Sequence, residues 1–289
     1  MLSDSTVAVL AQSSPALHIF DRDGKLIRAW GDNLHGAHGL THIIEEGTEY
    51  LWITDQYSGR VTKYDLQGNV HQSIAPPAED EGNYSPTWVA ISPVTRDIWV
   101  ADGYGCNVIR RYSSKGTYKG KLTGEEGPGR FARPHGIAFH PNGTLYIADR
   151  RNRRILVYDE NGRYWFHRDH ITHSPCGFAI RGELLYVPEL FGDLKVLDLS
   201  LNLHSSYGTN FDVRPEHGWP EQQGWGWPEL RNWPDELDPL HIQPSAFIAP
   251  HAVALAPDNT IYVVEWVRGG RITKGSPVIS TCHEACRAP

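Results

Sequence analysis

The sequence lacks the features that mark nucleic-acid-binding and membrane proteins. It has no long run of lysine or arginine, and its 289 residues carry a formal net charge of −7. Because binding to phosphates or anionic lipids needs clustered positive charge, we expect neither nucleic acid nor a membrane as a partner. No apolar stretch approaches the ~18 residues of a membrane-spanning helix. The opening "MLSDSTVAVLAQ" has no basic segment before its short apolar run, so we expect a first strand there and not a signal peptide.

Cysteine is also scarce. The four cysteines, at positions 106, 176, 282 and 286, are too few and too scattered for a disulfide framework. Cys282 and Cys286 form one Cys-x3-Cys pair, without the second pair that a structural zinc site needs. We therefore expect reduced thiols and a cytoplasmic location.

Aromatic and turn-forming residues, in contrast, are abundant. Ten Trp, thirteen Tyr, 28 Gly and 20 Pro favour many short strands joined by turns. A unit of about 40 residues recurs, and each copy alternates apolar and polar residues as four short strands would. Full copies begin at Ala37, Pro86, Pro134, Pro175 and Pro250, and a partial copy covers residues 6–31.

Radial repetition of four-stranded units is typical of a β-propeller. The units "PHGIAFHPNGTLYIADRRNRRILVYD" and "GLTHIIEEGTEYLWITDQYSGRVTKYD" resemble NHL repeats. We predict an all-β fold, a six-bladed β-propeller of NHL-type repeats, forming a single domain over 1–289. The first unit lacks an inner strand and the last lacks an outer one. A Trp- and Pro-rich insertion at about 209–246 separates blades five and six, either as a surface excursion or as a lid beside the channel mouth.

The residue that opens the inner strand of each blade should lie at one mouth of the central channel. These positions hold His38, Thr87, His135, Cys176 and His251. The spacing to the acid that ends the next strand is fourteen residues for His135 and His251 and fifteen for Thr87, so the positions are equivalent. Histidines occupy blades two, four and six, about 120° apart in a six-fold ring. Three converging imidazoles form the tripod of a catalytic zinc site, although His35 and His42 are alternatives to His38.

An acidic residue ends the second strand of each full unit. These residues are Asp55, Asp102, Asp149, Glu189 and Glu265. A carboxylate cluster is one interpretation, but we favour a structural role in which each acid ties down a turn between neighbouring strands.

Histidines at alternate blades, "ADGY" in blade three and "ADR" in blade four resemble peptidyl-α-hydroxyglycine α-amidating lyase. The resemblance implies a six-bladed propeller whose axial histidines hold zinc and which cleaves a carbinolamide into an amide and glyoxylate. It implies that His38, His135 and His251 are the zinc ligands. It also implies that Tyr104 is the base and Arg150 the active-site arginine.

The sequence departs from this family at four places. A first-blade arginine is replaced by Gln12, and a cysteine pair is broken because Ser85 faces Cys106. Ala249 replaces a methionine, and Ala252 replaces an acid that helps to hold calcium. A calcium ion is therefore doubtful, and the groups that would recognise a glycine-extended peptide are changed.

Together these observations predict a zinc-dependent lyase or hydrolase acting on a small carbinolamide-, amide- or ester-like substrate. In a lyase the metal binds the substrate hydroxyl, and in a hydrolase it activates water. The alternative is a non-catalytic NHL propeller that serves as a protein-binding scaffold. The sequence leaves the oligomeric state open.

Overall fold

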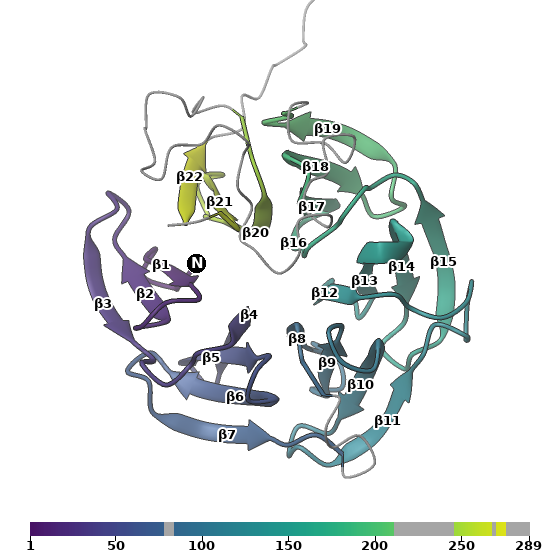
Figure 1. Cartoon of the computed structure of the whole chain (residues 1–289), viewed down its shortest axis with the longest axis horizontal. Coiled ribbons are helices and arrows are strands. Elements are labelled where there is room, and N and C mark those ends of the chain that lie inside the picture. Colours follow the sequence, from purple (N-terminus) through teal and green to yellow (C-terminus); the bar gives the residue numbers. More distant parts are fainter. Residues whose placement is uncertain (78–83, 211–245, 268–269, 276–289) are drawn as a thin grey trace, which may run out of the picture.

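The computed structural model describes residues 1–77, 84–210, 246–267 and 270–275. Within these residues the fold is all-β, and six antiparallel sheets surround a central axis as the blades of a propeller (Figure 1). The predicted fold class is therefore confirmed. Among the described residues there is no helix long and apolar enough to cross a membrane.

The blades follow one another around the axis in chain order (Figure 1). Blade one consists of β1 (Val7–Leu10), β2 (Leu17–Phe20) and β3 (Leu26–Trp30). Blade two consists of β4 (Ala37–Glu45), β5 (Thr48–Asp55), β6 (Arg60–Asp65) and β7 (Val70–Ile74). Blade three consists of β8 (Trp88–Ile91), β9 (Ile98–Asp102), β10 (Val108–Tyr112) and β11 (Tyr118–Leu122).

The second half of the chain continues the ring. Blade four consists of β12 (Pro134–Phe139), β13 (Leu145–Asp149), β14 (Arg154–Tyr158) and β15 (Tyr164–Asp169), with a short 3-10 helix, η2 (Arg150–Asn152), after β13. Blade five consists of β16 (Ala179–Arg181), β17 (Leu184–Glu189), β18 (Asp193–Asp198) and β19 (Leu203–Tyr207). Blade six consists of β20 (Pro250–Leu255), β21 (Ile261–Glu265) and β22 (Arg271–Gly275).

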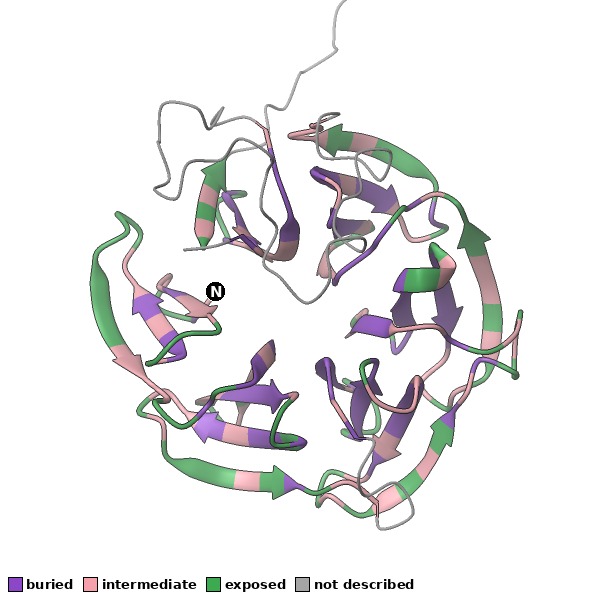
Figure 2. Ribbon diagram, viewed as in Figure 1, coloured by how far each residue is buried: buried purple, intermediate pink, exposed green. Residues whose placement is uncertain are grey.

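Burial follows the position of a strand within its blade. The middle strands are largely buried, whereas the outermost strands consist mainly of half-buried and exposed residues (Figure 2). The core lies between neighbouring blades: Trp88 and Trp99 of blade three pack in one cluster with Ile137 and Leu145 of blade four. Each sheet thus buries its faces against the next blade, which one sheet alone could not do.

The ring closes between blades one and six. In the described residues both have three strands: blade one begins with the equivalent of a second strand, and blade six ends with the equivalent of a third. Val7 of β1 packs with Ala256 and Tyr262 of blade six, which joins the two ends of the ring. Most of the predicted 209–246 insertion lies outside the described residues.

Candidate metal and catalytic site

Each candidate histidine lies within a shift of strand pairing at the start of an inner strand. In blade four, Pro134 pairs with Asp149 but Ile137 pairs with Ile147, so β12 holds one extra residue. The same kind of shift falls around His38 in β4 and around His251 in β20. Blade three, which has no histidine here, pairs regularly. A bulge re-aims a side chain that strict alternation would turn elsewhere, and here it accompanies each axial imidazole.

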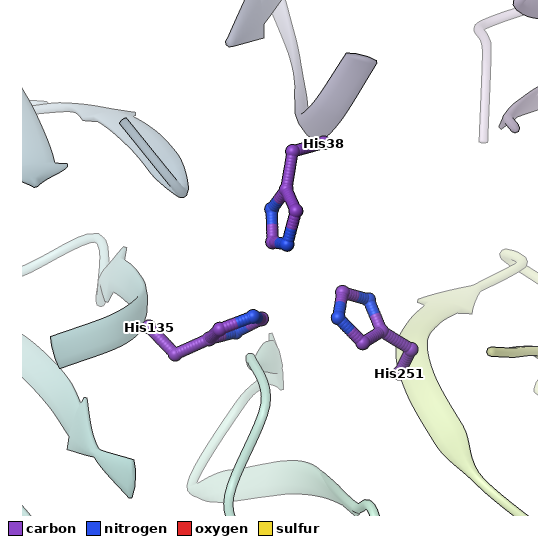
Figure 3. Close-up of side chains that lie close together, drawn as sticks. All are labelled: His38, His135 and His251. Carbon is purple, nitrogen blue, oxygen red and sulfur yellow. The ribbon is translucent and has the colours of Figure 1, made fainter. Parts of the chain in front are cut away.

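The three imidazoles converge from blades two, four and six (Figure 3). The nearest ring nitrogens of His38, His135 and His251 all lie within 4.8 Å of one another. The ring centroids are 4.8 Å apart for His38 and His135, 5.1 Å for His38 and His251, and 4.8 Å for His135 and His251. Equivalent repeat positions are thus brought together from distant parts of the chain.

Main-chain carbonyls orient two of these rings. Nδ1–H of His38 donates to the carbonyl oxygen of Thr87 at 2.8 Å, and Nδ1–H of His135 donates to that of Cys176 at 2.6 Å. Because a carbonyl only accepts, the proton of each neutral ring lies on Nδ1. The lone pair on Nε2 therefore remains available at the axis.

Loss of solvation keeps these histidines neutral, His135 being fully buried and His38 and His251 half-buried. Loss of solvation lowers the pKa of His38 to about 4, with the Arg150 charge acting in the same direction and the bond to Thr87 opposing it. Burial and the nearby cationic groups lower the pKa of His135 and of His251 well below the ordinary value. Since a metal binds the neutral imidazole, these rings are at neutral pH in the form that a metal would require.

Tyr104 lies over two of the rings. Its hydroxyl is 3.2 Å from Nε2 of His38 and 3.2 Å from Nε2 of His135. Nη1 of the buried Arg150 donates to the same oxygen at 3.4 Å. The guanidinium of Arg133 lies 6.0 Å from the centre of the tyrosine ring. The side chains that the resemblance implies are therefore neighbours, and the Tyr104 hydroxyl lies between the Nε2 atoms of two candidate ligands and a cation.

A glycine in the turn after β9 allows this placement. A side chain at Gly103 would bring its Cβ to 2.2 Å from the carbonyl oxygen of Pro134. The turn therefore lies against blade four because residue 103 has no side chain. Tyr104, one residue later, is thereby held beside His135.

The two alternative histidines lie elsewhere. Nε2 of His42 is 2.7 Å from a carboxylate oxygen of Glu49, and His35 is exposed in the turn before β4. Neither takes part in the group that could hold a metal.

The strand-ending acids bond to main-chain N–H groups near the inner strands. Asp149 accepts from Ala132 N–H at 2.7 Å, and Glu189 accepts from Ser174 N–H at 2.8 Å. Asp102 and Glu265 accept similar bonds. These contacts fit the structural role favoured above and do not form a carboxylate cluster.

Two contributors to the site were not identified from sequence. The carbonyl groups that orient His38 and His135 carry no sequence signal, because every residue has one. Arg133 directly precedes the Pro134-His135 pair, and that proximity was the only available hint.

Comparisons with known proteins first define the class. A family model described as the NHL repeat matches residues 131–158. The fold is also similar to the crystal structure of a catalytically inactive variant of virginiamycin B lyase from Staphylococcus aureus with quinupristin. That match has a TM-score of 0.59 at 14% sequence identity and covers 94% of this chain and 77% of that chain. The protein is a six-bladed β-propeller that contains an NHL repeat.

Sequence relatives give the more particular resemblance, to peptidyl-α-hydroxyglycine α-amidating lyase. The chain is 31% identical over 156 residues to a probable enzyme of this name from Caenorhabditis elegans, covering 50% of this chain and 43% of the relative. It is 28% identical over 279 residues to peptidyl-alpha-hydroxyglycine alpha-amidating lyase 1 of Drosophila melanogaster, covering 88% and 47%. Human NHL repeat-containing protein 3 is 30% identical over 165 residues, covering 52% and 47%. The chain therefore spans less than half the length of these three relatives.

Proposed function

We propose that this chain is a zinc-dependent lyase or hydrolase related to peptidyl-α-hydroxyglycine α-amidating lyase. Its substrate is a small-molecule or peptide-like carbinolamide, amide or ester that binds at the channel axis. The observation that carries the proposal is the convergence of three neutral imidazoles beneath the Tyr104 hydroxyl. Relatives named as amidating lyases support an enzymatic propeller of this kind.

The donor set suits zinc. Three imidazole nitrogens and an open fourth position are typical of a catalytic zinc site, and the nitrogens of His38, His135 and His251 would supply the three. A bound zinc ion would polarise a substrate oxygen or lower the pKa of a bound hydroxyl or water. Calcium forms no part of the proposal, because Ala252 stands where the family has an acid.

Tyr104 is the group that would move the proton. Its oxygen is 3.2 Å from Nε2 of two candidate ligands, and it therefore faces the position of a substrate oxygen bound at the axis. Nη1 of Arg150 lies 3.4 Å from the same oxygen, so a cation stands beside the atom that would accept a proton from a substrate hydroxyl or from water. Proton acceptance from the substrate hydroxyl corresponds to a lyase, and acceptance from water corresponds to a hydrolase.

A non-catalytic scaffold is the alternative, and similarity to NHL repeat-containing protein 3 is the observation in its favour. A protein-binding propeller does not need three desolvated histidines on its axis. The lowered pKa values of His135 and His251 suit metal binding, which needs neutral imidazoles, so the tripod favours the enzyme.

Metal content tests the proposal. We expect the protein purified in the presence of zinc to hold about one zinc ion per chain, as a site with three protein ligands predicts. Inductively coupled plasma mass spectrometry measures the metal content. His135→Ala should lose it, whereas the control His42→Ala, which removes a histidine bonded to Glu49, should keep it. A wild-type protein without bound transition metal would contradict the proposal.

Substrate turnover then separates the enzyme from the scaffold. The zinc-loaded protein should convert at least one member of a panel of α-hydroxyglycine derivatives, lactones and cyclic amides, and the His135→Ala variant should not. Stoichiometric zinc without turnover of any of them would favour the scaffold.

A further inference from the structure

Thr87 occupies the inner-strand position of blade three, between two blades that carry candidate ligands. It lies directly before β8, which runs between β4 and β12 in the ring (Figure 1). Its side chain is fully buried. Thr87 contacts the histidines on both sides, His38 and His135.

The main chain of Thr87 holds the ring of His38. Its carbonyl oxygen accepts Nδ1–H of His38 at 2.8 Å, and the Thr54 hydroxyl donates to the same oxygen at 3.2 Å. A Cβ added at Gly39 would approach this oxygen to 2.5 Å, so the close approach of the two blades depends on glycine there. The carbonyl thereby sets both the direction of the His38 ring and the position of its proton.

The side chain of Thr87 reaches the other neighbour. Its hydroxyl lies 2.8 Å from the carbonyl oxygen of His135 and 3.2 Å from those of Ala101 and Pro134. A hydroxyl has one proton to donate, and the shortest of these contacts is the one to His135. The hydroxyl thus fixes the main chain of one ligand while the carbonyl fixes the ring of another.

Blade five has no equivalent bridge among the residues that the structure describes. The Cys176 carbonyl oxygen accepts Nδ1–H of His135, but its thiol points to the Ser174 carbonyl within its own blade at 3.5 Å. Next to blade six, the described part of the chain gives blade one no inner strand that could offer a carbonyl to His251. Thr87 therefore connects two of the three candidate ligands, His38 and His135, through its own hydrogen bonds.

We propose that Thr87 is a positioning residue that sets the spacing and orientation of His38 and His135 for metal binding. This inference rests on the metal site of the proposed function. Hydrogen-bond partners behind metal-binding histidines typically change metal affinity by about 10- to 100-fold when removed. The hydroxyl of Thr87 should contribute at the lower end of that range, because it acts through the main chain.

Zinc affinity of hydroxyl-deletion variants tests the proposal. Thr87→Val keeps the side-chain shape and removes the donor, and we expect its zinc dissociation constant, measured by competition with a chromophoric chelator, to rise about 10-fold. Thr87→Ser, which keeps the hydroxyl, should remain close to wild type. The control Thr62→Val removes a buried hydroxyl that bonds to Ser73 in β6 and β7, and it should leave zinc affinity unchanged.

Cobalt-loaded protein adds a readout that stability alone would not move. The visible absorption bands of bound Co²⁺ depend on ligand geometry, so Thr87→Val should alter them and Thr87→Ser should not. Unchanged affinity and bands in Thr87→Val, or an equal loss in Thr62→Val, would overturn the positioning role while the metal site stands. A wild type that binds no zinc would overturn the proposed function first.

Nuclear magnetic resonance of the metal-free wild type keeps the proposal testable if Thr87→Val does not fold. The imidazole of His38 should carry its proton on Nδ1, and that proton should exchange slowly because the Thr87 carbonyl accepts it. A His38 ring protonated only on Nε2 would overturn the role of Thr87.

Discussion

Blades three and five occupy the same place relative to the site but contribute different side chains to it. Each lies between two blades with candidate ligands, and each offers one carbonyl oxygen to the preceding histidine, from Thr87 and from Cys176. Two residues after the strand-ending acid, blade three has Tyr104 and blade five has Phe191. In both blades a main-chain carbonyl thus orients a histidine ring, whereas only the turn of blade three places a hydroxyl beside the rings.

The acids of these two blades also have different surroundings. In blade three, Asp102 forms an ion pair with Arg110 at 2.9 Å, and both side chains are fully buried. In blade five, Glu189 pairs across the strands with Asp193, whose carboxylate binds Lys195 at 2.8 Å. One oxygen of Glu189 has no hydrogen-bond partner among the described residues. Burial raises the pKa of Glu189 to about 7.

The largest difference between the two blades should be the effect on kcat of replacing the side chain in the turn. Tyr104→Phe removes the hydroxyl beside the ligands, and we expect kcat to fall about 10²- to 10⁴-fold, the usual contribution of a positioned acid or base, while zinc is retained. Phe191→Leu at the equivalent position in blade five is the control, with a small effect on kcat. Steady-state kinetics on a substrate of the wild type measures both, and unchanged turnover in Tyr104→Phe would remove the tyrosine from the mechanism.

The next effect concerns the ion pair that the strand-ending acid of blade three, Asp102, forms with Arg110. Arg110→Met leaves the Asp102 carboxylate buried without its cation, and we expect a loss of about 3–5 kcal/mol in the free energy of unfolding. Urea denaturation measures it. Adding Asp102→Asn should recover part of the loss, because the uncompensated charge is then gone. If Arg110→Met were as stable as wild type, the ion pair between Arg110 and Asp102 would not stabilise the fold.

The smallest effect should appear in blade five as a dependence on pH. The pKa of Glu189 is raised from its ordinary value of 4.5 to about 7, so the folded state binds the proton more tightly than the unfolded state. Its contribution to stability is complete below about pH 4.5 and is lost as the pH rises through about 7.

Glu189→Gln should therefore remove part of the decline in stability between pH 5 and 8, a change of about 1–3 kcal/mol. Thermal unfolding at a series of pH values measures it, with the exposed Glu183→Gln as the control. Parallel pH profiles for wild type and Glu189→Gln would show that this carboxyl does not titrate in that range.

The repeat made the fold and the position of the tripod predictable from sequence. Once the copies were aligned, His38, His135 and His251 fell at equivalent places, and a propeller brings equivalent places to the axis. Tyr104 and Arg150 needed the family resemblance, since one tyrosine and one arginine in turns carry no periodic signal. The structure places both beside the histidines.

The remaining features depend on three-dimensional proximity that no sequence pattern encodes. Which carbonyl faces His135 depends on how closely blade five approaches, and a Cβ at Gly136 would lie 2.4 Å from the Cys176 oxygen. The protonation of Glu189 depends on which side chains share its buried surroundings. Arg133 reaches Tyr104 only because the turn of blade three lies against blade four.

The alternation of ligands around the ring has a consequence for the order of events during synthesis. The three histidines span positions 38 to 251, so the set is incomplete until blade six has left the ribosome. Contacts between such distant residues form late, because they require long loops to close first. A metal held by these three histidines could therefore not nucleate the fold, and its binding would mark a ring that has already closed.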